Sequence, residues 1–188
     1  MNATYPVFWL IALAAMTVAA FQDVKHRLIP NLLVLIVLLA AVGLRVNGGF
    51  AAAGLSFVAT AIVAGLLYLL ADREYMGWGD AKMIAAASLL VPPQGVVLLM
   101  FCIVFVGGLL SCVYVLARLA VRHRPQSYYA AASCLGGGRG GIVQRELARI
   151  AAHKSMPYGI AILGGTFCWL LNRVIECSFA TSCSFWAH

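Results

Sequence analysis

Six runs of apolar residues dominate the chain, and polar or turn-forming segments separate them. The runs cover residues 5–21, 28–46, 51–71, 83–91, 95–120 and 157–175. A helix needs about 20 mostly apolar residues to cross the hydrocarbon core of a bilayer. The pattern therefore predicts an all-α, polytopic membrane protein with about six transmembrane helices. We expect residues 1–188 to form one membrane-embedded domain.

The fourth run is the weakest candidate for a span, because it is short and is stopped by Pro92 and Pro93. Residues 83–91 would rise only about 14 Å as a helix, roughly half of the hydrocarbon core. If this run did not cross, the next helix would carry a strongly basic loop to the outside. We therefore keep six spans and expect the fourth helix to begin within the preceding polar stretch.

The composition supports a membrane protein and argues against a soluble one. Apolar residues make up 63% of the chain and charged residues 10%, whereas soluble domains average roughly 45–50% and about 25%. The formal net charge is +7, but the basic residues do not gather in one soluble patch. The expected partner is therefore the lipid bilayer, and no nucleic acid is expected.

The basic residues also predict the orientation of the chain. Of the 13 Lys and Arg residues, 11 fall in the first, third and fifth connections between the runs. Cytoplasmic loops of membrane proteins carry such an excess of Lys and Arg. These three connections are therefore predicted to be cytoplasmic, with both termini outside.

The long fifth connection, residues 121–156, divides into two parts. Its glycine-rich stretch at 135–141 is interpreted as a flexible linker. Residues 142–153 have apolar positions on one face and Arg145 and Arg149 on another, which predicts a cytoplasmic amphipathic helix lying on the anionic inner leaflet. A solvated helix without membrane contact is the alternative.

Two of the six acidic residues occupy positions that suggest chemistry. Asp23 ends the first run, where we expect the helix to meet water, and Asp80 follows Gly77-Trp78-Gly79 at the head of the fourth helix. Glycines allow a close approach or a sharp bend of the backbone. Both aspartates are predicted on the same side of the membrane, so they can meet.

Two adjacent carboxyl groups have the chemistry of an aspartic peptidase. When they are held together, one pKa rises and the pair shares a proton. The neutral acid can protonate a carbonyl or a leaving amine, and the carboxylate can take a proton from an attacking water. In the alternative reading, Asp23 pairs with Lys25 or Arg27, and Asp80 only caps a helix.

Three segments resemble motifs of the type IV prepilin peptidases. Asp23 followed by Pro30 and Asn31 resembles their first motif, and Gly-Trp-Gly-Asp-Ala-Lys at 77–82 resembles their Gly-x-Gly-Asp motif. Pro-Tyr-Gly at 157–159 is similar to a further family feature. The resemblance covers nearly the whole chain in order and spacing.

The resemblance implies an aspartic endopeptidase that needs no metal or cofactor. Such an enzyme removes the short basic leader of prepilins at the cytoplasmic face of the bacterial inner membrane. By this match Asp23 and Asp80 are the catalytic pair. The residues implied to shape the site or bind substrate are Gly77, Trp78, Gly79, Lys82, Pro30, Asn31 and Tyr158.

The chain resembles the short members of that family, which serve Flp/Tad-type pili. Long members carry a cytoplasmic insertion, often with paired Cys-x-x-Cys, and also methylate the new amino terminus. Here only five residues separate Asp23 from Ile29, and the sequence contains no Cys-x-x-Cys. The implied substrates are Flp or type IV pilin-like prepilins, and the motifs give no support for N-methyltransferase activity.

Two other functions remain as alternatives. A presenilin-type intramembrane protease shares the Gly-x-Gly-Asp motif, but its first aspartate belongs in a helix core, whereas Asp23 is closely followed by Lys25, His26 and Arg27. The chain could instead be a small transporter or a non-enzymatic membrane subunit. A proton-coupled transporter would favour carboxylates near the bilayer midplane and broken helices in corresponding halves.

Overall fold

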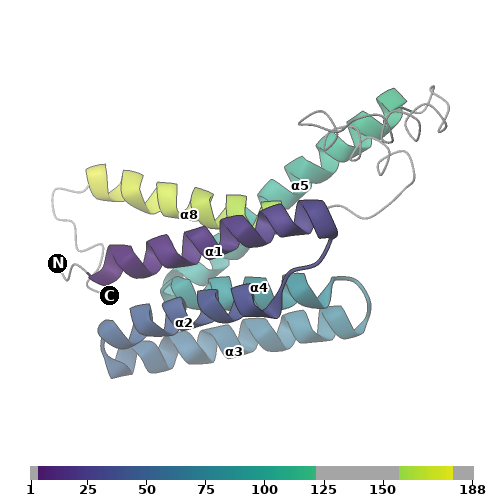
Figure 1. Cartoon of the computed structure of the whole chain (residues 1–188). Coiled ribbons are helices and arrows are strands. Elements are labelled where there is room, and N and C mark those ends of the chain that lie inside the picture. Colours follow the sequence, from purple (N-terminus) through teal and green to yellow (C-terminus); the bar gives the residue numbers. More distant parts are fainter. Residues whose placement is uncertain (1–3, 122–156, 180–188) are drawn as a thin grey trace. The chain divides into compact units, whose positions relative to one another are not determined.

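The computed structural model describes residues 4–121 and 157–179, and every regular element in these ranges is helical (Figure 1). This finding confirms the all-α prediction. The helices are α1 (Thr4–His26), α2 (Asn31–Asn47), α3 (Phe50–Asp72), α4 (Trp78–Leu90), a 3₁₀ turn (Pro93–Gly95), α5 (Val96–Val121) and α8 (Gly159–Phe179). The predicted amphipathic helix at 142–153 lies outside the described residues.

The chain divides into two compact units. One contains Met1–Gly107 and Tyr158–His188, and the other contains Gly108–Pro157. All the site residues predicted from the sequence lie in the first unit. The prediction of one domain over residues 1–188 stays a prediction.

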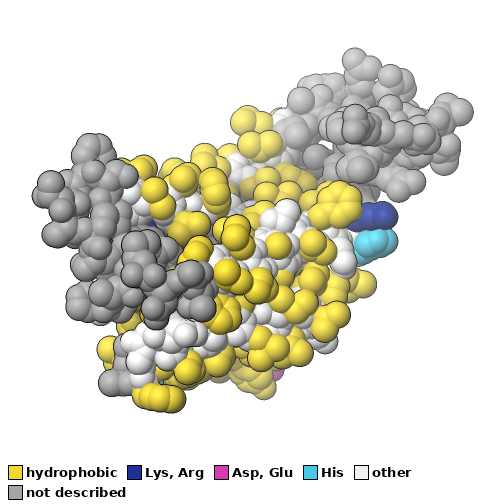
Figure 2. Space-filling view, turned by 60° about the vertical axis from the view of Figure 1, so that its left-hand side comes forward, with side chains coloured by type: hydrophobic (Ala, Val, Ile, Leu, Met, Phe, Trp, Pro, Cys, Tyr) yellow, Lys and Arg dark blue, Asp and Glu magenta, His cyan; other side chains and the backbone are white. Residues whose placement is uncertain are grey.

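Four of the described helices are long and apolar enough to cross a membrane. The candidate spans are Tyr5–His26, Ala53–Asp72, Pro93–Leu116 and Gly159–Glu176. Hydrophobic side chains are also spread over the described part of the face shown in Figure 2. The helices therefore support a membrane protein. The number six stays a prediction, because α2 has 17 residues and α4 only 13.

The ends of α4 follow from its local sequence. The helix begins at Trp78, inside the polar stretch, as predicted, and Gly77 before it has an extended backbone. Asp80 then lies in the first turn, where a negative charge complements the helix dipole. The helix ends at Leu90, shortly before the two prolines, which cannot donate backbone hydrogen bonds.

The short helix α4 lies in the interior of the first unit rather than on its surface. Eight of its residues are buried: Ala81, Met83, Ile84, Ala86, Ala87, Ser88, Leu89 and Leu90. It packs against α2, α3 and α8, while α1 packs against α2 and α8 (Figure 1). Because protein surrounds most of α4, this helix does not need the length of a lipid-facing span.

The last turn of α4 is capped by Arg45, which lies near the end of α2. The Arg45 side chain donates from Nε to the carbonyl of Leu89 at 2.9 Å and from a terminal nitrogen to the carbonyl of Leu90. The last carbonyls of a helix have no partner within it, and a cation there complements the dipole. Arg45 thus donates hydrogen bonds to these carbonyls inside the protein, as water does to the last carbonyls of a helix that ends at a membrane surface.

Candidate active site

Asp23 lies in the last turn of α1, which continues beyond the apolar run to His26. Its side chain is only 7% exposed, although Lys25 and His26, which follow it at the end of the helix, are exposed. Its Oδ2 accepts a hydrogen bond from the backbone N–H of Gly159 at 2.8 Å. Gly159 is the first residue of α8, and the first N–H groups of a helix lack partners within it. Asp23 therefore joins the end of α1 to the start of α8.

The close approach of α1 and α8 at this point favours a glycine at position 159. A Cβ atom there would lie 3.0 Å from Oδ2 of Asp23 and 3.3 Å from the backbone Cα of Ala20. Both separations are tighter than ordinary van der Waals contact. The Pro-Tyr-Gly segment thus places a backbone donor, with no side chain, directly against the buried carboxylate.

Asp80 lies close enough to Asp23 for the two charges to interact. Burial, and then the negative charge of Asp23, raise the pKa of Asp80 from its ordinary value of 3.8 to about 6. The group lies in the first turn of α4, ahead of the apolar part of that helix. The structure thus brings together the two carboxylates that the sequence placed on one side of the membrane.

The two glycines of the Gly-Trp-Gly-Asp segment make room for neighbouring atoms. A Cβ at Gly77 would lie 3.1 Å from Oδ2 of Asp80, and a Cβ at Gly79 would lie 3.3 Å from Cβ of Ile29. The first glycine therefore leaves space for the Asp80 carboxylate. The second lets the start of α4 pack against the connection between α1 and α2.

Tyr158 is the third side chain at the site. Its pKa is raised, first by burial and then by the negative charge of Asp80, so the phenol lies within electrostatic reach of that carboxylate. A Cβ at Gly107 of α5 would lie 3.0 Å from the Tyr158 hydroxyl, which places the ring tightly against that helix. The sequence selected Tyr158 through its motif, and the structure adds the contact with α5.

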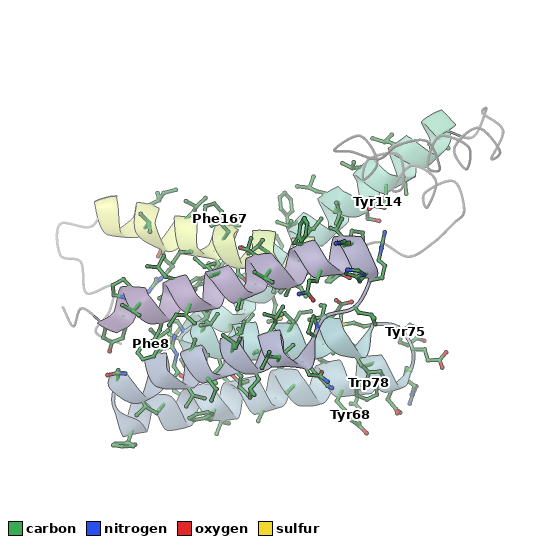
Figure 3. The ribbon with its side chains drawn as sticks, viewed as in Figure 1. Phe8, Tyr68, Tyr75, Trp78, Tyr114 and Phe167 are labelled. Atoms are coloured by element: carbon green, nitrogen blue, oxygen red, sulfur yellow. The ribbon has the colours of Figure 1, made fainter. Side chains whose placement is uncertain are left out.

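The remaining predicted residues lie on the elements that surround the carboxylates. Trp78 is 47% exposed, and its ring packs edge-on against Tyr68 of α3 with centroids 5.3 Å apart (Figure 3). Pro30 is the N-cap of α2, and Asn31 and Lys82 are exposed. Their roles in shaping the site or binding substrate stay predictions.

Sequence reasoning missed the backbone donor of Gly159, because a main-chain N–H has no side-chain signature. Only the Pro-Tyr-Gly motif could have pointed to it. Within the described part of the chain, no group of three or more His, Cys, Asp or Glu residues could hold a metal ion.

Comparison with known proteins identifies the family. A family model described as "Type IV leader peptidase family" matches residues 10–112, and this range includes both Asp23 and Asp80. No curated protein and no solved structure matches the chain. The matched range covers more than half of the 188 residues. The chain therefore belongs to the type IV leader peptidase family.

Proposed function

We propose that this chain is an aspartic endopeptidase that removes the leader peptide of prepilins at the cytoplasmic face of the bacterial inner membrane. Membership of the family supports leader cleavage in general. The observation that carries the aspartic mechanism is the interaction of Asp80 with the buried Asp23. Two carboxyl groups in one site, one neutral and one ionised, provide the acid and the base that peptide hydrolysis needs.

The reaction adds one water molecule across the scissile peptide bond. The ionised carboxylate takes a proton from the water as its oxygen attacks the carbonyl carbon, and the neutral carboxyl gives its proton to the carbonyl oxygen. As the tetrahedral intermediate collapses and its C–N bond breaks, one of its hydroxyls returns a proton to the carboxylate that had acted as the acid. The leaving amine receives the proton that the other carboxylate had taken from the water. A bound apolar substrate would displace water and further favour the neutral form of Asp80.

A prepilin fits the surroundings of this site. In the proposed complex the basic leader lies in the cytoplasm, and the apolar start of the mature pilin lies in the bilayer against the exposed hydrophobic side chains of the helices. Gly77, Gly79 and Tyr158 shape the site, while Trp78, Lys82, Pro30 and Asn31 are the candidates for contact with the peptide. The short connection between Asp23 and Ile29 favours Flp or type IV pilin-like substrates.

The two alternatives are less well supported. A presenilin-type protease would place its first aspartate within a helix core, whereas Asp23 lies in the last turn of α1. A transporter or a non-enzymatic subunit would not be expected to match a peptidase family over both aspartates.

Co-expression with candidate prepilins tests the proposed function. We expect the intact mass of a Flp-type prepilin to fall by the mass of its leader when this chain is present. Cells carrying an empty vector provide the baseline. If the chain reaches the membrane but no Flp or type IV prepilin loses its leader, the proposed activity is wrong.

The proposed orientation predicts which cysteines an impermeant thiol reagent labels in intact cells. Single cysteines replace Ser127 or Ser184 in a background without the six native cysteines. Six spans place position 184 outside and position 127 in the cytoplasm, so only the former is expected to be labelled. The reverse pattern would reject six spans, although it would leave Asp23 and Asp80 on one side of the membrane.

A further inference from the structure

The two carboxylates of the site have different surroundings. Asp23 is 7% exposed and accepts the backbone N–H of Gly159. Asp80 is partly buried, and its neighbour Gly77 leaves space beside its Oδ2. The proposed reaction needs one acid and one base, and either aspartate could take either role. The difference between their surroundings can decide which aspartate is the acid and which is the base.

We propose that the start of α8 assigns the two roles, with the Gly159 N–H holding Asp23 as the ionised base and leaving Asp80 as the acid. This inference rests on the proposed function. A hydrogen bond from a backbone N–H to a carboxylate stabilises the ionised form. The N-terminal end of the α8 dipole acts in the same direction. Gly159 is thus a positioning residue that acts through Asp23.

The charges around Asp80 agree with this assignment. Burial, and then the negative charge of Asp23, raise the pKa of Asp80 to about 6, so Asp80 keeps its proton at a higher pH than an ordinary aspartate does. Tyr158, at the start of α8, also faces Asp80, and its raised pKa keeps the phenol neutral. Asp72 at the end of α3 and Lys82 on α4 are exposed, so water and salt screen them.

The assignment has a consequence for the pH profile of cleavage. Activity requires Asp23 ionised and Asp80 protonated, so the rate falls on both sides of an optimum. In this proposal, the fall in rate toward low pH (the acid limb of the profile) reports the protonation of Asp23. The fall in rate toward high pH (the alkaline limb) reports the loss of the Asp80 proton. Removing the Gly159 donor should therefore move the acid limb alone. A merely structural contact would lower the rate at every pH without moving either limb.

An amide-to-ester replacement at Gly159 tests the proposal without changing any side-chain volume. Cell-free synthesis into lipid nanodiscs, with glycolic acid delivered at codon 159, replaces the N–H by an oxygen atom. We expect the acid limb to move upward by about one pH unit, because a charge-assisted hydrogen bond is lost. The alkaline limb should stay where it is. The readout is the initial rate of leader removal from a prepilin between pH 4 and pH 8.

The same ester at Gly164 is the matched control. It uses the same reagent in the same helix, but Gly164 lies against Val106 rather than against an aspartate. Both limbs of the pH profile should therefore keep their wild-type positions. An ester at Gly159 that leaves the acid limb in place, or that moves the alkaline limb instead, would overturn the assignment. Cleavage by the Asp23→Asn or Asp80→Asn protein would instead refute the proposed function, so the two failures are distinguishable.

Discussion

Asp23→Asn and Asp80→Asn are each expected to lower the rate of leader cleavage by about 10²–10⁴-fold, the usual contribution of a general acid or base. An amide can neither take a proton from water nor donate one as a carboxylic acid does. The substitution keeps the size of the side chain. In the Asp23→Asn protein the amide oxygen can still accept the Gly159 N–H, so the junction between α1 and α8 should persist. The measurement is the initial rate of leader removal, compared at equal amounts of folded protein.

Asp72→Asn is the matched control for both variants. Asp72 is the last residue of α3, and its side chain is exposed, so the same change of charge should leave the cleavage rate close to that of the wild type. Near-wild-type cleavage by a well-folded Asp23→Asn or Asp80→Asn protein would show that the substituted aspartate does not act in the reaction.

Arg45→Leu is expected to destabilise the folded protein by about 2–4 kcal/mol, because it leaves the carbonyls of Leu89 and Leu90 without their donor. Arg45→Lys keeps the charge but loses the two-nitrogen fork, so an intermediate loss is expected. The free energy of unfolding can be measured by titrating the purified protein with a denaturing detergent.

Arg73→Leu is the control for this experiment. Arg73 follows the end of α3 and is exposed, and exposed substitutions usually change stability by less than about 0.5 kcal/mol. Equal losses for Arg45→Leu and Arg73→Leu would show that the cap on α4 contributes nothing. A loss of stability in Arg45→Leu but not in Arg73→Leu would explain how the 13-residue helix α4 keeps Asp80 in place.

Local sequence predicted most helix positions because apolar runs and their stop signals act over a few residues. The start of α4 in the polar stretch and its end before Pro92 follow from such signals. The end of α1 does not follow from a local signal, because the apolar run ends near Phe21 while the helix continues through charged residues to His26. The burial of Asp23 depends on a partner 136 residues away, which no local pattern reveals.

The candidate site was predictable in part. The Gly-x-Gly-Asp segment and the placement of both aspartates on one side of the membrane led to the pair, and the Pro-Tyr-Gly motif led to Tyr158. The exposed position of Trp78 against Tyr68 was not predictable, because that contact depends on how α3 and α4 pack. The role of Arg45 was not predictable, because its partners are the backbone carbonyls of Leu89 and Leu90, and no sequence pattern marks a backbone carbonyl.

The most direct test of the central claim is leader cleavage by the purified chain alone. The protein is reconstituted in lipid nanodiscs with a purified Flp-type prepilin, and the intact masses of the products are measured over time. We predict one cut, which releases the basic leader and a pilin with a new amino terminus, and no product with the Asp23→Asn, Asp80→Asn double variant. An unchanged prepilin with the wild-type protein, or equal cleavage by the double variant, would contradict it.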